Sequence, residues 1–424
     1  MIACDKRISF FILWGDQTRI LTLGSKACLG SLLAIFAVCA KQASAQDQAV
    51  FAGQVDFSWQ QFSIPSVGSG TLPMGEKSVT ASGPTTGFSA GVRLSPDPDA
   101  FSLMWTGSYF DLSGHSSSTN AISSNPFIIT VGSPGSGEID LSTITDSSGA
   151  SALANVNFTD STGATTAISS SASSPAGPNS VTQYAVSPTA AGAAFAALVT
   201  DGRGPSAASY GAFADGQGLI FAGVGDFGAS TVRTWSFVHA TGYTQTVWLA
   251  KPLAPDRDFT LKAGLTYRRS RESYGNGMAF DLASSVSGTS IPTVSLSEAG
   301  KFNVEAGGPV VGFDARFHPP APFMIGVSGT AGMAFFGARS RLTHTVVLPQ
   351  VAAIEDTASV RRDSGVMGLT GMEVSLIFPL EERVELRVSG SVQSTFGAPR
   401  PTAGDIKRYN ISQYGVGVSL AARF

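Results

Sequence analysis

Alternation of apolar and polar side chains over segments of roughly ten residues is the feature that most limits what this chain can fold into. In one such segment Val384, Leu386 and Val388 alternate with Glu385 and Arg387. A strand with one face toward lipid and one toward a polar interior requires this period of two. After residue 45 the sequence contains no apolar stretch as long as ~18 residues, so a transmembrane helix is not expected there.

The final segment shows the clearest alternation and ends on an aromatic residue. Its apolar face is formed by Tyr414, Val416, Val418, Leu420 and Phe424. Here the sequence resembles the bacterial outer-membrane β-barrel proteins, whose last strand ends in a C-terminal Phe with apolar residues at alternate preceding positions. The resemblance identifies no subfamily. It implies that this strand is the assembly signal read by the barrel-assembly machinery, which becomes an expected partner beside outer-membrane lipid.

The first 45 residues have the layout of a secretory signal peptide. A basic stretch ends at Lys26, an apolar run extends from Leu29 to Ala40, and Ala43-Ser44-Ala45 forms an A-x-A cleavage site. The apolar run is shorter than the ~20 residues that span a bilayer. We therefore assign 1–45 to a signal peptide and 46–424 to a protein of the cell outer membrane.

The alternating segments predict an all-β fold, a transmembrane antiparallel up-and-down β-barrel of ten strands with long extracellular loops. We expect the strands at 49–61, 86–95, 100–112, 233–250, 258–271, 301–317, 322–340, 364–378, 383–396 and 408–424. An even strand number places both termini in the periplasm, together with the short turns between strands. The longer connections, rich in Ser, Thr, Gly and Pro, then lie outside the cell.

One of these outer connections, 113–232, is far longer than the ~12–15 residues beyond which a structureless loop becomes suspect. Within it, Ala190–Val199 is compatible with a short helix and Gly218–Phe227 with a strand. The insertion is therefore either a surface subdomain on a ten-stranded barrel or the site of another hairpin in a twelve-stranded barrel. We favour ten strands.

Charged residues at inward positions of the predicted strands are the candidate functional residues. Arg or Lys on the lipid-facing side would cost ~2–4 kcal/mol at the bilayer midplane, which forces such side chains inward. The predicted lumen charges are Asp56, Arg93, Lys262, Arg268, Arg316, Glu373, Glu385, Arg387 and Arg423. Because Glu373, Glu385 and Arg387 fall on the two strands of one hairpin, we expect them to lie close together. They form either a structural polar core, in which the charges pair with one another, or a selectivity ring along a narrow pore.

Composition and motifs give little sign of catalysis. Charged residues make up 13% of the chain and the net charge is −3, which argues against nucleic-acid binding. Cys4, Cys28 and Cys39 all precede the expected cleavage site, so neither disulfides nor thiol chemistry is expected. The histidines have no zinc-ligand spacing, and His239 is the strongest of a weak set. We expect neither a metal nor a cofactor, and no enzymatic activity.

Three functions remain compatible with this sequence. A ten-stranded barrel is close to the eight-stranded size that side chains just fill, so we favour a surface-exposed barrel whose loops bind an extracellular ligand, adhere, or stabilise the envelope. The first alternative is a narrow channel for small solutes. The second is an autotransporter-like arrangement with a passenger at 46–210, which the hairpin pattern between Phe88 and Tyr109 argues against.

Overall fold

The structure, a computed structural model, describes residues 8–14, 17–23, 51–64, 79–95, 97, 100–122, 125–226, 230–253, 258–281, 293–348, 354–355, 359–401 and 406–423. Within the expected leader, β1 (Ile8–Trp14) and β2 (Gln17–Leu23) form a two-stranded hairpin that is separate from the main sheet. The apolar run from Leu29 to Ala40 and the A-x-A site lie outside the described residues, so the signal peptide stays a prediction. None of the described residues forms a helix long and apolar enough to cross a membrane.

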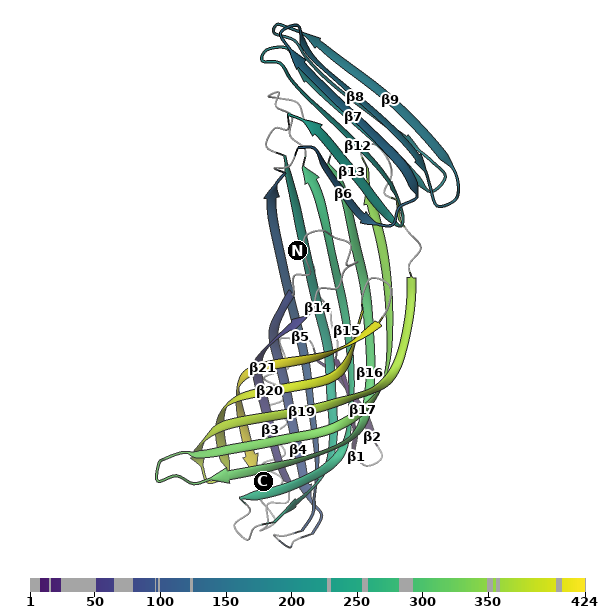
Figure 1. Ribbon diagram of the computed structural model, residues 1–424. Helices are drawn as coiled ribbons and strands as arrows, with labels where there is room; N and C mark the ends of the chain where they lie inside the picture. Colours follow the sequence, from purple (N-terminus) through teal and green to yellow (C-terminus); the bar gives the residue numbers. More distant parts are fainter. Residues whose placement is uncertain are drawn as a thin grey trace.

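The main sheet of the described residues is a closed antiparallel barrel of ten strands, which confirms the predicted fold class (Figure 1). Consecutive strands pair throughout, β21 pairs with β3, and β16 pairs with β17, so no open edge remains in the ring. A short strand, β18 (Ile354–Glu355), pairs with the end of β17. The barrel strands are β3 (Phe51–Ile64), β4 (Val79–Arg93), β5 (Ser102–Ala121), β14 (Thr231–Pro252), β15 (Phe259–Asp281), β16 (Val294–Phe317), β17 (Met324–Val347), β19 (Ser359–Glu381), β20 (Val384–Pro401) and β21 (Ile406–Arg423).

Several strands are much longer than predicted, because the alternation changes its sense part of the way along. In β16 the half nearer the short turns points Val311 outward, whereas the other half buries Phe302 and Val304 inside and exposes Lys301 and Asn303 outside. A strand of 23 residues such as β15 exceeds the ~9–11 needed to cross a bilayer. The barrel wall therefore continues well beyond the membrane, with its apolar face turned inward.

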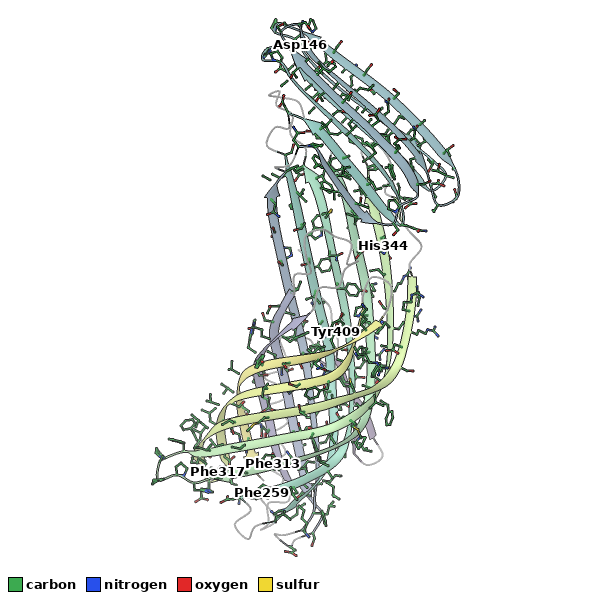
Figure 2. The ribbon with its side chains drawn as sticks, viewed as in Figure 1. Asp146, Phe259, Phe313, Phe317, His344 and Tyr409 are labelled. Carbon is green, nitrogen blue, oxygen red and sulfur yellow. The ribbon has the colours of Figure 1, made fainter. Side chains whose placement is uncertain are left out.

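The outward face of the membrane-spanning part is a continuous apolar band. Its exposed side chains include Phe57, Trp59, Leu103, Trp105, Val247, Leu249, Leu261, Leu265, Val311, Met333, Phe335, Val366, Met372, Val374, Leu376, Val388, Val416 and Val418. At the short-turn end, the rings of Phe259 and Phe313 stack with centroids 6.0 Å apart, near the exposed Phe317 (Figure 2). At the other border Tyr243 and Tyr267 lie in ring contact. Such aromatic girdles at the two edges of an apolar band are typical of barrels that span the outer membrane.

The insertion forms a separate β-sandwich, so the twelve-stranded alternative is wrong. Its larger sheet has the order β10-β11-β12-β13-β6, and its smaller sheet has the order β7-β8-β9 (Figure 1). The strands are β6 (Phe127–Gly132), β7 (Ser136–Asp146), β8 (Gly149–Thr159), β9 (Thr165–Pro175), β10 (Ser180–Pro188), β11 (Gly192–Asp201), β12 (Ser206–Asp215) and β13 (Gly218–Gly225). The insertion is also shorter than predicted, since β5 continues to Ala121 and β14 begins at Thr231.

The helix expected at Ala190–Val199 is wrong, because this segment belongs to β11. Ala193 to Val199 are all buried, on both faces of the strand. One face packs on the smaller sheet through Ala194, Ala196 and Leu198, and the other contributes Phe195 to a second core. A strand covered on both faces loses its alternation and resembles a buried helix in sequence. The strand expected at Gly218–Phe227 is confirmed as β13.

The second core of the sandwich is shared with the far ends of the barrel strands. Phe195, Tyr210 and Phe221 of the larger sheet pack into one buried cluster with Val232, Met278, Phe280, Val294, Leu296 and Val346 of β14 to β17. The rings of Phe221 and Phe280, both 0% exposed, have centroids 4.8 Å apart. The sandwich is thus seated on the inward face of the extended wall instead of hanging from a flexible loop.

The two sheets of the sandwich are also linked by the carboxylate of Asp160, which follows β8. Its Oδ1 accepts hydrogen bonds from the hydroxyl of Thr162, at 2.6 Å, and from two backbone amides. Its Oδ2 accepts from the Thr189 hydroxyl at 2.6 Å and from the Ala191 amide at 2.7 Å, both in the β10–β11 turn. The hydroxyl groups of Thr162 and Thr189 hold the pKa of the Asp160 carboxyl well below its usual range.

We expect this linkage to make the sandwich sensitive to acid. A folded-state pKa below the unfolded value of about 3.9 adds stability that is complete well above that pH and is lost as the pH falls toward the folded pKa. Asp160→Asn keeps one acceptor and loses the other. The variant should therefore have a lower melting temperature of the sandwich at pH 7. Its melting temperature should also fall less steeply than that of the wild type as the pH drops below about 4.

Circular dichroism melts between pH 2 and pH 7 would measure both effects. The control is Asp146→Asn, at an exposed turn carboxylate whose two hydrogen bonds, from the amide and the hydroxyl of Ser148, stay within its own turn. Equal pH profiles for wild type and Asp160→Asn would show that this carboxylate does not link the sheets.

Candidate functional site

The barrel interior holds the predicted lumen charges, and its ion pairs show directly which way they point. Arg316 on β16 lies 3.2 Å from Glu385 on β20, although β17 and β19 separate these strands in the sheet. The pair therefore reaches across the interior. The same Glu385 receives a bond of 2.8 Å from Arg387, so one carboxylate serves two guanidinium groups.

The remaining predicted lumen charges whose side chains the structure describes occupy the same face of their strands. Lys262 forms an ion pair of 2.7 Å with Asp314 on the adjacent strand β16. Asp56, Arg93 and Arg268 lie at inward positions of β3, β4 and β15. The side chain of Arg423 lies outside the described part of the structure.

The expected three-residue cluster on the β19–β20 hairpin forms only in part. The register places Glu373 opposite Ser391, while Arg387 faces Ile377, so Glu373 is displaced along the strand from Arg387. Glu373 still interacts electrostatically with Arg387, and with Asp56 and Lys262 of other strands. Its environment is set by the whole ring of inward side chains and not by one hairpin.

A further inward ion pair is formed by two residues that the sequence pattern missed. Arg400 on β20 contacts Glu272 on β15 across the interior, and their side chains are only 8% and 6% exposed. Arg268 lies close enough to interact with both. Arg400 escaped prediction because a register shift between Thr395 and Ala398 changes the facing of the residues that follow. Glu272 and Arg400 also lie just beyond the segments in which the apolar alternation is visible.

At the level of Glu272 and Arg400, a layer of apolar side chains crosses the interior. It is one buried cluster to which all ten barrel strands contribute: Phe62, Val79, Ala81, Phe110, Leu112, Val238, Ala240, Tyr274, Phe302, Val304, Ala306, Ala334, Phe336, Ala338, Leu342, Met367, Ala398, Ile406 and Ile411. The hydroxyl groups of Tyr274 and Ser340 lie 3.1 Å apart within it. Close-packed apolar side chains leave little room for water.

The predicted assembly signal lies on the outward face of β21. Tyr414, Val416, Val418 and Leu420 are 62%, 67%, 48% and 41% exposed, as expected for lipid-facing positions. Phe424 lies outside the described residues. Recognition of this strand by the assembly machinery stays a prediction.

Three of the four histidines lie beside carboxylates. His239 Nδ1 is 3.5 Å from Asp111 on the outward face above the apolar band, and His318 Nδ1 is 3.1 Å from Asp258 at the short-turn end. His344 Nδ1 lies 3.1 Å from the buried Glu298, near the seat of the sandwich (Figure 2). Among the described residues there is no group of three or more His, Cys, Asp or Glu that would hold a metal ion.

Arg387→Ala tests whether the inward charges close the barrel or filter ions. Glu385 keeps Arg316 as a partner, so we expect a loss of about 1–3 kcal/mol in stability and little or no new conductance, because the apolar layer remains. Planar-bilayer recordings and unfolding in detergent would measure the two effects. Arg93→Ala, at another inward arginine, is the control. A wild-type conductance that Arg387→Ala shifts toward cations would instead identify the charges as a selectivity ring.

Comparison with known proteins leaves the family open. No protein-family model matches the chain, and no curated protein sequence matches it either. The outer-membrane protease OmpT from Escherichia coli is 9% identical, with 89% of this chain and 98% of that chain covered and a TM-score of 0.33. A FadL homologue of Pseudomonas aeruginosa is 10% identical over 88% of this chain and 90% of that chain, with a TM-score of 0.22.

The Pseudomonas putida toluene transporter TodX is 10% identical over 91% of this chain and 92% of that chain, with a TM-score of 0.17. At such TM-scores these likenesses carry no weight for the role of this chain. The closed barrel and its apolar outward band are by themselves the features of a protein of the cell outer membrane.

Proposed function

We propose that this outer-membrane β-barrel protein is a non-enzymatic surface protein that binds an extracellular ligand through its β-sandwich. The observation that carries the proposal is the core shared by the sandwich and the ends of β14 to β17. A barrel that served only to span the membrane would need no such extension. The extension holds a folded module in a fixed position on one side of the membrane.

The smaller sheet provides the surface that we assign to binding. It is the layer of the sandwich farthest from the barrel (Figure 1). Its free face is mostly polar, although it includes Ile144 and Leu153. Ser169 is bonded to Asn155 at 2.6 Å and Asn155 to Asp140 at 3.3 Å. The face also includes Glu138, Ser142, Ser151, Asn157, Ser171 and Ser173. Rows of hydroxyl, amide and carboxylate groups suit hydrogen bonding to a polar ligand such as a glycan or a peptide.

The barrel itself acts in this proposal as a filled anchor. The inward ion pairs and the apolar layer occupy the interior. A narrow channel remains the alternative function, and the bilayer recordings described for Arg387→Ala also test it. The autotransporter-like alternative is wrong in its boundary, because β3, β4 and β5 lie inside the assigned passenger 46–210 and are strands of the barrel.

The proposal is tested by changing the free face of the smaller sheet without touching its core. Asn155→Lys combined with Ser171→Lys introduces two large cations at outward positions. Bacteria that display this variant should lose most of the adhesion to a panel of glycan- and matrix-coated surfaces that the wild type shows. The control is Gln217→Lys, at an exposed turn elsewhere on the sandwich. Equal adhesion of wild type and double variant, at equal surface levels, would contradict the proposal.

A further inference from the structure

A basic recess lies on the outward face of the barrel wall, between the apolar band and the sandwich. It has a volume of about 1110 Å³ and is lined by side chains of β14, β15, β16, β17 and β19. Its cations, which define the basic recess, are Arg269, Arg271, Lys301, Arg339 and Arg362. None of the functions considered above uses them.

The carboxylates that line the basic recess are already engaged. Glu305 lies 3.1 Å from Arg269, Asp363 lies 3.8 Å from Arg408, and Glu272 is the inward partner of Arg400. Among the described residues, Arg271, Lys301, Arg339 and Arg362 form no ion pair with a carboxylate within 4.0 Å. The recess therefore carries an excess of positive charge.

The strand register makes this excess unfavourable for the barrel alone. Arg339 on β17 lies directly opposite Arg362 on β19, and Lys301 on β16 lies directly opposite Arg341 on β17. Like charges directly opposite each other on one face of a sheet destabilise it. Two such pairs on neighbouring strands are explained if an anion binds between them.

The place of the basic recess relative to the membrane indicates the source of that anion. On β15 the outward series passes from Leu265 and Tyr267 to Arg269, and on β17 it passes from Phe335 through Gly337 to Arg339. The cations therefore begin where the apolar band ends, at the level of lipid headgroups. At Gly337 nothing lies within 4 Å of the position a Cβ would take, so the floor of the recess is open to a bulky group.

We propose that the basic recess binds the phosphate groups of an anionic lipid headgroup, with the acyl chains of that lipid lying along the apolar band beside Phe335 and Val366. Guanidinium groups suit phosphate because their planar forks donate paired hydrogen bonds. With the short turns in the periplasm, this lipid belongs to the outer leaflet. A soluble phosphate would use the cations but gain nothing from the adjoining apolar surface.

The test uses the purified full chain, folded in an uncharged detergent, and follows its melting temperature as lipid is added. The probes are lipid A, which is a bisphosphorylated glycolipid, the same lipid with its phosphates removed, and inorganic phosphate. Lipid A should raise the melting temperature of the wild type. The lipid A concentration that gives half of the maximal rise in melting temperature should be about 10- to 30-fold higher for Arg339→Gln combined with Arg362→Gln than for the wild type. Arg203→Gln, at an exposed arginine of the sandwich, is the matched control and should leave it unchanged.

A second readout separates binding from a structural role. Without lipid, the double variant should melt at the same or a higher temperature than the wild type, because a like-charge pair has been removed. A clearly lower melting temperature would overturn the proposal. If the double variant does not fold, the single variant Lys301→Gln gives the same comparison. Its half-maximal lipid A concentration should be about fivefold higher than that of the wild type.

The lipid probes decide between the sources of the anion. Stabilisation by the dephosphorylated lipid equal to that by lipid A would show that only acyl contacts matter. Inorganic phosphate acting at the same concentration as lipid A would show a site for soluble anions. Either result overturns the proposal. Loss of lipid A binding with unchanged cell adhesion would leave the proposed role of the sandwich intact.

Discussion

Replacing Glu272 with Gln is expected to destabilise the barrel by about 3–5 kcal/mol, the cost of breaking a buried ion pair by removing one partner. Glu272 is the carboxylate that Arg400 contacts across the interior, and Arg268 interacts with both residues. Its neutralisation leaves two guanidinium groups close together in a largely buried place. Guanidinium chloride unfolding of the barrel in lipid vesicles would measure the loss.

A double variant controls for volume and for charge. Arg400→Met combined with Glu272→Met removes both charges and keeps most of the side-chain volume, so it should be far less destabilising than Glu272→Gln alone. Equal losses for the two variants would show that packing, and not uncompensated charge, dominates at this position.

Replacing Phe280 with Ala is expected to weaken the seat of the sandwich by about 3–5 kcal/mol. The side chain is fully buried between the extended wall and the larger sheet, in contact with Phe221. Its removal leaves a cavity between two rigid layers that cannot close without moving one of them. Limited proteolysis should then cut the segments that join the sandwich to β5 and β14 faster than in the wild type.

Phe259→Ala is the control in the same strand. Phe259 lies on the outward face of β15 and is 37% exposed, in contact with Phe313. Its truncation leaves a gap that lipid or detergent can fill, so its effect on stability should be much smaller. Similar losses for the two variants would show that the shared core does not hold the sandwich in place.

The membrane-spanning part of the fold could be read from the sequence because lipid imposes a local rule. A strand between lipid and a polar interior must alternate, as Val384 to Val388 does, and a strand edge in lipid must be paired. The antiparallel barrel and the inward position of Lys262 or Arg316 follow from that rule, whereas the choice between ten and twelve strands required the structure of the insertion. Asp314 shares this face with Arg316 and could have been named from the same pattern.

Beyond the membrane the rule changes, and sequence pattern alone was insufficient. The walls of β16 and β17 continue with the opposite alternation, because water replaces lipid outside and Phe302 and Phe336 pack inside. A pattern search tuned to one sense of alternation ends each strand too early. Of the recess cations, Arg362 was therefore assigned to a loop. Arg269, Arg271, Lys301 and Arg339 lay near the ends of expected strands, where their outward cluster was not recognised.

The sequence by itself determined the closed barrel and its apolar band, since both depend on contacts between each residue and its solvent. The tertiary structure decided what depends on contacts between distant residues. These are the burial of β11 on both faces, the pairing of Glu272 with Arg400 across the barrel, and the juxtaposition of Arg339 with Arg362. Each requires two segments far apart in the chain to meet in one register, and alternation within either segment carries no information about that register.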